Sequence, residues 1–122
     1  MSERSIMDVE EETRLVKDFT LYPILLDMLA RDADDLNVYS DKIVYHHILL
    51  YLKDIENLIH AEIHTLRLTM KKRDIKILNT NRTVTGVEVD YLVRGYVRHF
   101  NMLRSLIKAD LLTLLMSLRG KV

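Results

Sequence analysis

The stretch over residues 40–78 most constrains how this chain can fold. Ser40 is a favourable helix N-cap, and after it apolar side chains recur every three or four residues for about seven turns, uninterrupted by Gly or Pro. These apolar positions are Val44, Ile48, Tyr51, Leu52, Ile55, Leu58, Ile59, Ile63, Leu66 and Met70. The pattern predicts one long amphipathic helix over residues 41–78.

The composition favours helices in the rest of the chain as well. Only three Gly and one Pro occur among the 122 residues, and the common residues are good helix formers. We therefore expect an all-α fold in a single domain, residues 1–122. The chain has no cysteine, which excludes disulfides, zinc-thiolate sites and thiol catalysis.

A second long helix is predicted over residues 86–118. Thr85 and Glu88 have capping-box spacing, and Gly120 stands where a C-terminal glycine belongs. Two long helices joined by a short connection predict an antiparallel helical hairpin, formed by residues 41–78 and 86–118. At the junction an alternative stays open, in which residues 75–78 and 84–89 pair as a short β-hairpin.

One or two shorter helices are expected before residue 40. Ser5 and Asp8 have capping-box spacing, and Pro23 should either end the first helix or kink a continuous one. The acidic start does not resemble a signal peptide, and the apolar run over residues 106–118 is too short to cross a bilayer. We expect a soluble cytoplasmic protein with no membrane segment.

The last predicted turns are apolar on nearly every side, and such a helix has to be buried. This predicts a homodimer that completes a four-helix-bundle-like core, unless the N-terminal helices cover the same surface. The residues expected to form the self-association surface are Leu111, Leu112, Leu115 and Leu118.

Glu56, His60 and His64 form the most site-like pattern in the sequence. Their spacing of four residues aligns a carboxylate and two imidazoles on one helix face, where they could ligate a metal. His60 and His64 rotate away from the apolar stripe, however, and metal sites in bundles use inward-facing side chains. Solvent-exposed histidines are therefore the competing interpretation, and we expect no cofactor.

Glu62 falls inside the apolar stripe of the predicted helix over residues 41–78. Arg104 falls on the stripe of the predicted helix over residues 86–118. A buried carboxylate needs a partner, and a hairpin turning near residue 82 would bring position 62 opposite about position 102. The sequence therefore predicts a structural core pair between Glu62 and Arg104.

Charge is unevenly distributed although the net charge is zero. Residues 1–64 carry 6 Lys or Arg against 14 Asp or Glu, whereas residues 65–108 carry 10 against 3. Such asymmetry allows a basic binding surface, although the two halves could also pair with each other. The candidate partner-binding residues are Lys71, Lys72, Arg73, Arg82, Arg94 and Arg98.

No catalytic motif is present in the sequence, so an enzyme is disfavoured. The leading hypothesis is a self-associating helical adaptor or small regulator that acts by binding an unknown protein. One alternative is a metal-binding helical bundle or metalloenzyme that uses Glu56, His60 and His64. A second alternative is nucleic-acid binding through the basic residues of the hairpin end.

Overall fold

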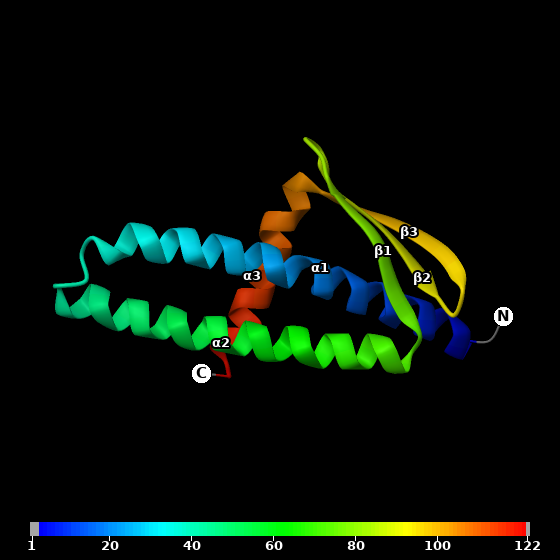
Figure 1. Ribbon diagram of the computed structural model, residues 1–122, viewed down its shortest axis with the longest axis horizontal. Coiled ribbons are helices and arrows are strands. Elements are labelled where there is room, and N and C mark those ends of the chain that lie inside the picture. The colour runs from blue at the N-terminus through cyan, green and yellow to red at the C-terminus, as the bar shows by residue number, and fades with distance from the viewer. Residues whose placement is uncertain (1–2, 122) are drawn as a thin grey trace.

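The computed structural model describes the backbone of residues 3–121 and the side chains of residues 8–121 (Figure 1). The predicted cap at Ser5 lies outside the described side chains. Along the chain the elements are α1 (Glu3–Asn37), α2 (Ile43–Lys72), β1 (Ile75–Arg82), β2 (Gly86–Val93), β3 (Tyr96–Leu103) and α3 (Arg104–Arg119). In this described part, no helix is both long and apolar enough to span a membrane.

The predicted all-α fold is wrong, because residues 75–103 form a three-stranded antiparallel sheet of order β1-β2-β3. The β-hairpin alternative names the right region but is too short and omits β3. Residues 86–118 are therefore two strands followed by α3, and the predicted second long helix does not form. The helical-bundle architecture built on that helix is wrong with it.

Period-two alternation explains why residues 86–93 form a strand. Val87, Val89, Tyr91 and Val93 are buried against the helices, whereas the intervening side chains are more exposed. Arg94 and Gly95 then form a two-residue turn with φ of 50° and 86°. Positive φ at both positions matches the twist of an antiparallel hairpin, so this turn joins β2 to β3.

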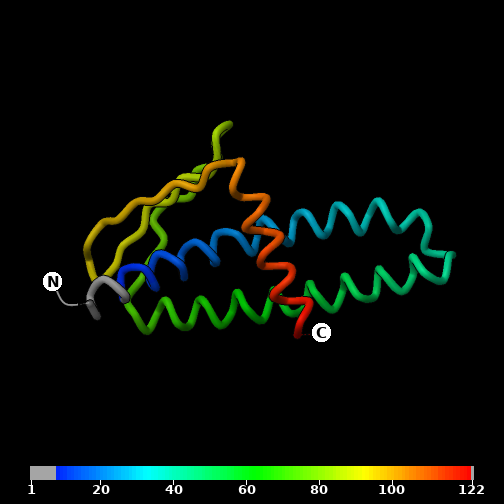
Figure 2. Tube along the Cα trace, turned by 180° about the vertical axis from the view of Figure 1, so that it is seen from behind, coloured from blue at the N-terminus to red at the C-terminus, as the bar shows by residue number. Residues whose placement is uncertain are grey.

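A long antiparallel helical hairpin does exist, but its arms are α1 and α2 (Figure 1). α1 continues through Pro23, so it forms one helix of about 52 Å where shorter helices were expected. The prediction of one helix over residues 41–78 is wrong at both ends: the N-cap residue of α2 is Lys42 and not Ser40, and α2 ends at Lys72. Asp74 then has a φ of 54°, which redirects the chain into β1. α3 crosses this hairpin on the face turned toward the viewer in Figure 2 and ends beside α2.

The core lies where α1 is enclosed between α2, α3 and the inner face of the sheet. Fully buried apolar side chains from each of these layers belong to a single hydrophobic cluster, so the chain has one core. They include Val16 and Leu21 of α1, Ile55 and Ile59 of α2, Val89 and Val93 of β2, and Leu118 of α3.

A buried carboxylate attaches the sheet to α1. Glu12 is only 1% exposed, and its Oε1 accepts a hydrogen bond from Arg94 Nη1 at 2.7 Å. Arg98 Nη1 lies 3.4 Å from the other carboxylate oxygen. The bond to Glu12 raises the pKa of the Arg94 guanidinium. Two cations thus compensate one desolvated anion, which makes the burial of Glu12 tolerable.

This ion cluster gives a testable asymmetry. Replacing Arg94 and Arg98 together by Ala should lower the free energy of unfolding, because the Glu12 carboxylate stays buried without a cation. Glu12→Gln should cost less, since it removes the charge and keeps the shape. Urea unfolding of both variants measures the difference, with Arg119→Ala as a surface control. A Glu12→Gln cost equal to that of the double variant would contradict this account.

Gly86 gives a second prediction, at the start of β2. A Cβ built there would overlap the carbonyl oxygen of Met102 on the neighbouring strand. Gly86→Ala should therefore lower the free energy of unfolding by about 1–3 kcal/mol in thermal or urea unfolding. Gly120→Ala is the matched control, because Gly120 has helical φ and its nearest Cβ contact is an ordinary 3.6 Å. Equal effects of the two substitutions would argue against a close approach at Gly86.

Candidate functional site

The residues proposed as metal ligands lie along the side of α2. The Glu56 carboxylate is 3.6 Å from Lys53 Nζ and 3.8 Å from His60 Nε2, and His60 and His64 are exposed. Within residues 8–121, no group of three or more His, Cys, Asp or Glu side chains is arranged to hold a metal. The metal site stays a prediction, and the structure brings no ligand to it from another helix.

Glu62 and Arg104 do not form the predicted pair. Glu62 Oε1 instead accepts a hydrogen bond from Lys121 Nζ at 2.8 Å, beyond the end of α3. Arg104 is the first residue of α3, and it lines a hollow of about 480 Å³ that Glu62 does not line. The predicted pairing assumed a helical register between residues 41–78 and 86–118, and that register is lost because residues 86–103 are strands.

The predicted self-association surface is divided by the fold. Leu111 and Leu118 are buried inside the chain, so they are not available to a second copy while α3 stays packed. Leu115 is half-buried, and Leu112 is exposed.

The predicted basic surface is divided in the same way. Arg94 and Arg98 bind Glu12, and Arg73 Nη2 lies 2.9 Å from Glu11 Oε1, so these three cations serve internal contacts. Lys72 is exposed at the end of α2. Lys71 and Arg82 both line hollows beside β1, and the exposed Arg82 also lies 3.7 Å from Asp27 Oδ2, measured from its Nη2.

Three hollows beside β1 share lining residues and form one surface, which we call the groove. A hollow of about 410 Å³ and a second of about 170 Å³ share Phe19 and Ile77. The second hollow shares Ile24 and Arg82 with a third of about 480 Å³ near the start of α3. On α1, residues 19–31 line the groove, which is about 18 Å of helix.

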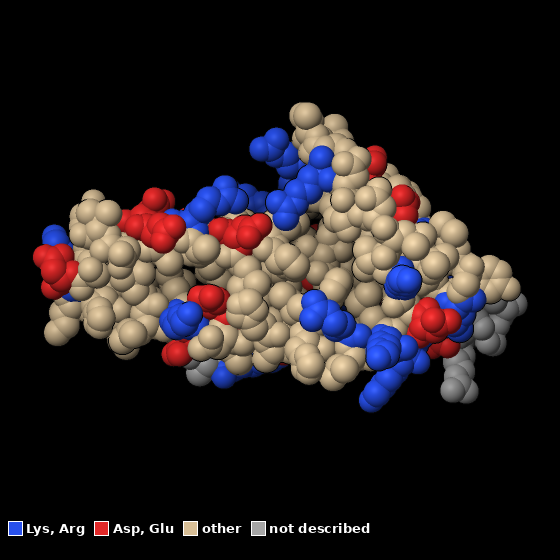
Figure 3. Space-filling view, in the orientation of Figure 1, with Lys and Arg blue, Asp and Glu red and all other residues tan. Residues whose placement is uncertain are grey.

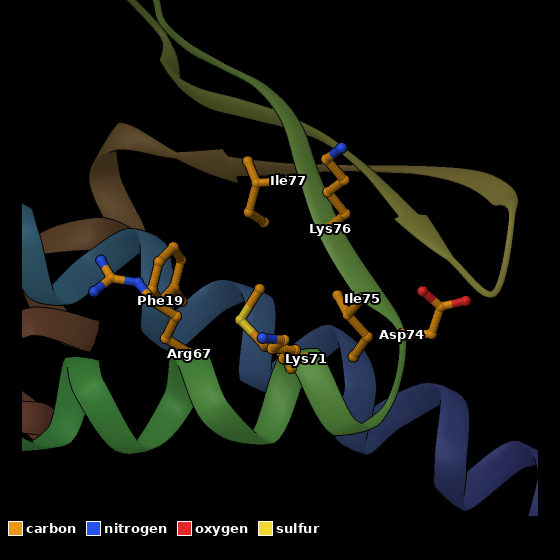
Figure 4. Close-up of a pocket in the computed structure, with 8 residues that line it drawn as sticks. Phe19, Arg67, Lys71, Asp74, Ile75, Lys76 and Ile77 are labelled. Atoms are coloured by element: carbon orange, nitrogen blue, oxygen red, sulfur yellow. The ribbon is translucent and has the colours of Figure 1, made fainter.

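The floor of the groove is largely apolar. Figure 4 shows Ile75 and Ile77 directed from β1 toward the helices, with Lys76 on the other side of the strand. The Phe19 side chain extends from α1 below them. The Arg67 guanidinium lies over the Phe19 ring, with its carbon 5.7 Å from the ring centroid. Further along, the apolar lining side chains are Ile24, Met28, Val87, Ile107 and Leu111.

The groove has a strongly basic margin. Asp74 is the one acidic residue that lines it within the described part of the chain, against seven basic ones. The basic side chains are Arg31, Arg67, Lys71, Lys76, Arg82, Arg104 and Lys108. In Figure 3, Lys and Arg flank the hollowed part of this face. An occupant of this groove therefore meets a positive potential over an apolar floor.

β1 supplies one wall of the groove and is also an edge strand. It pairs with β2 on one side, and no other strand of the described chain pairs with its second side. Most of its residues are exposed, especially over residues 78–82. Unpaired backbone N–H and C=O groups on an edge can accept an added strand.

A second, polar cavity of about 670 Å³ lies among α1, α2 and α3. Burial raises the pKa of Asp18, and burial together with Glu62 and Asp18 raises the pKa of Tyr22 to about 12. Lys17 Nζ lies 3.0 Å from Asp110 Oδ2, and Lys121 compensates Glu62. Two of the four acidic residues that line the cavity thus have a lysine partner, and its four acidic and three basic residues nearly balance, whereas basic residues clearly outnumber acidic ones along the groove.

Sequence reasoning identified Lys71 and Arg82 but missed the groove and the polar cavity. Phe19, Ile77 and Ile107 come from three elements, and only the docking of the sheet makes them neighbours. The alternation of apolar and more polar residues over positions 86–93 was the sequence signal for that sheet.

A family model described as YhjD protein matches residues 7–122. The chain belongs to the YhjD family. The YhjD match covers the groove and the polar cavity together with all of α2, the sheet and α3. No curated protein and no solved structure matches the chain.

His99 provides a prediction on the outer side of the sheet. Its Nδ1 is hydrogen-bonded to Asp90 Oδ1 across β2 and β3, and this bond raises the pKa of His99 above 6.5. We expect Asp90→Asn to lower that pKa in an NMR titration, with Glu88→Gln, a weaker contributor, as the control.

The pH dependence of stability follows from this shift. Because folding raises the pKa of His99, the pair stabilises the fold fully below pH 6.5 and stops doing so as the pH rises through the folded-state pKa. The gap in unfolding free energy between the natural chain and Asp90→Asn should shrink over that range. A gap that widens with pH would contradict the assignment.

Proposed function

We propose that this protein is a non-enzymatic adaptor or small regulator that binds an extended acidic segment of another protein in the groove. The observation that carries the proposal is the continuous groove itself, which combines an apolar floor, a basic margin and an unpaired strand edge. Each of these features selects a different property of the occupant. A cytoplasmic location is part of the same proposal.

The strand edge selects an extended backbone. An added segment could form main-chain hydrogen bonds with β1, which supply affinity independent of sequence. The alternation of a strand would then send every second side chain toward the floor that Phe19, Ile75 and Ile77 form. Apolar side chains fit that floor.

The basic margin selects acidic residues between the apolar ones. Lys71, Arg82 and Arg104 lie at different points along the groove, so carboxylates spaced along one segment would each meet a cation. Exposed charges of this kind contribute more to association rate and selectivity than to affinity. Apolar contacts and backbone pairing would supply most of the binding free energy.

Nucleic acid fits this groove less well than an acidic polypeptide. Proteins that bind single strands stack bases on aromatic side chains, and the lining of the groove offers a single aromatic ring, Phe19, already covered by Arg67. Its floor is otherwise aliphatic, which favours apolar side chains over sugars and phosphates.

Binding of a synthetic peptide in which Val and Glu alternate tests the proposal. We expect it to bind more tightly than its counterpart with Lys in place of Glu, and N-methylation of its backbone should weaken binding because methylated amides cannot pair with β1. Isothermal titration calorimetry measures all three affinities. Equal binding of the acidic and basic peptides, or no effect of N-methylation, would contradict the proposal.

The matched protein variants reverse two charges each. Lys71→Glu with Arg82→Glu should weaken the acidic peptide by about tenfold, since two exposed attractions become repulsions. Lys53→Glu with Arg119→Glu changes the net charge equally, but neither residue lines the groove. The same loss in both double variants would mean that only the overall charge matters. A mixed-sequence oligonucleotide in the same assay would favour the nucleic-acid alternative if it bound more tightly.

A further inference from the structure

The far end of the α1–α2 hairpin carries an exposed apolar surface, which we call the tip patch. Its residues are Val38, Tyr39, Ile43, Val44, Tyr45, Ile48 and Leu50. Ile43 is 85% exposed and Val38 is 77% exposed, so these side chains are largely in water. The tip patch shares no residue with the groove.

The packing of the described chain explains why the tip patch is exposed. Leu29 is the last buried residue of α1, and Ile55 is the first of α2. Beyond them each helix arm has the other as its main neighbour, because the sheet and α3 pack nearer the opposite end of the hairpin (Figures 1 and 2). Two helices alone cannot enclose a core, whereas two helical hairpins can form a four-helix bundle.

The charges of the two arms indicate which occupant fits. Residues 30–37 of α1 carry one Arg and three Asp, a net charge of −2. Residues 41–54 carry two Lys and two Asp, so the α2 arm has no net charge, with Lys42 and Lys53 near its two ends. No ion pair of the described residues joins these two arms within the chain. A second copy related by a two-fold axis would place each acidic α1 arm against a neutral α2 arm that carries Lys42 and Lys53, and would keep the two acidic arms apart.

The available area also suits a second copy. The seven tip-patch residues are 36–85% exposed and together present on the order of several hundred Å² of surface per copy, the same order as the approximately 800 Å² that each partner contributes to a standard interface. An apolar surface of this size is unusual on a monomer.

We propose that two copies of this chain associate through their tip patches, with the hairpin ends packed antiparallel as a four-helix bundle. The α1 arm of one copy lies against the α2 arm of the other. This places self-association on residues 38–50 and not on the predicted surface of Leu111, Leu112, Leu115 and Leu118. The groove of each copy stays outside the bundle.

Sedimentation equilibrium of the full chain over a wide concentration range tests this assignment. We expect a dimer with micromolar affinity for the natural chain, and monomers when Ile43→Asp or Leu50→Asp places a charge in the tip patch. Leu112→Asp is the matched control, because Leu112 is similarly exposed on α3. Circular dichroism verifies that each variant keeps its helices.

Each outcome has a definite meaning. Dimerisation that survives Leu112→Asp and disappears with Ile43→Asp and Leu50→Asp supports the tip patch. A natural chain that stays monomeric at millimolar concentration overturns the proposal. A dimer abolished by Leu112→Asp and retained by the folded Ile43→Asp variant also overturns it, and would assign the interface to α3.

Discussion

The burial of the Glu12 carboxylate between two arginines is the interaction on which the rest of the structure depends. α1 and α2 could pair through their apolar stripes alone, but the sheet needs a fixed place on that hairpin. Arg94 and Arg98 bring the β2–β3 turn to the first turns of α1. Because Glu12 is buried, any shift of the sheet that separates these groups leaves a desolvated anion without a cation. The cluster therefore specifies position as well as contributing to stability.

The groove is a consequence of how the sheet is docked. The backbone N–H of Arg94 donates a hydrogen bond to the carbonyl oxygen of Asp74 at 2.9 Å. This bond joins the start of β1 to the β2–β3 turn, at the end of the sheet that lies near Glu12. From there β1 diverges from α1 toward its exposed end at Arg82 (Figure 1). The space between them is lined by side chains of both elements but not filled by them. The polar cavity differs because its acidic and basic lining residues nearly balance, with Lys17 beside Asp110 and Lys121 beside Glu62.

Local patterns in the sequence predicted the middle of α2 but neither of its ends, and they did not predict the sheet. The stripe containing Ile55, Ile59 and Met70 is buried as its helical period requires. Residues 86–103 carry two competing patterns. Some of their apolar residues are spaced three or four apart, as in a helix, whereas Val87, Val89, Tyr91 and Val93 alternate as in a strand. The structure follows the alternation. Gly95 in the middle of the predicted helix, next to Arg94, was the turn signal that should have outweighed the helical spacing. The groove could not be predicted from local patterns, since it joins side chains that only tertiary docking brings together.

The chain order of the elements has a consequence for folding. The α1–α2 hairpin and the three-strand meander each join elements that follow one another directly in the chain, so each can form without the other. The contact between Glu12 and Arg94 spans 82 residues and requires both units to exist. We therefore infer that docking of the sheet is the late step, limited by closure of the long loop between them. Until the sheet docks, the valine side chains on its inner face are exposed to solvent and can make apolar contacts with other chains.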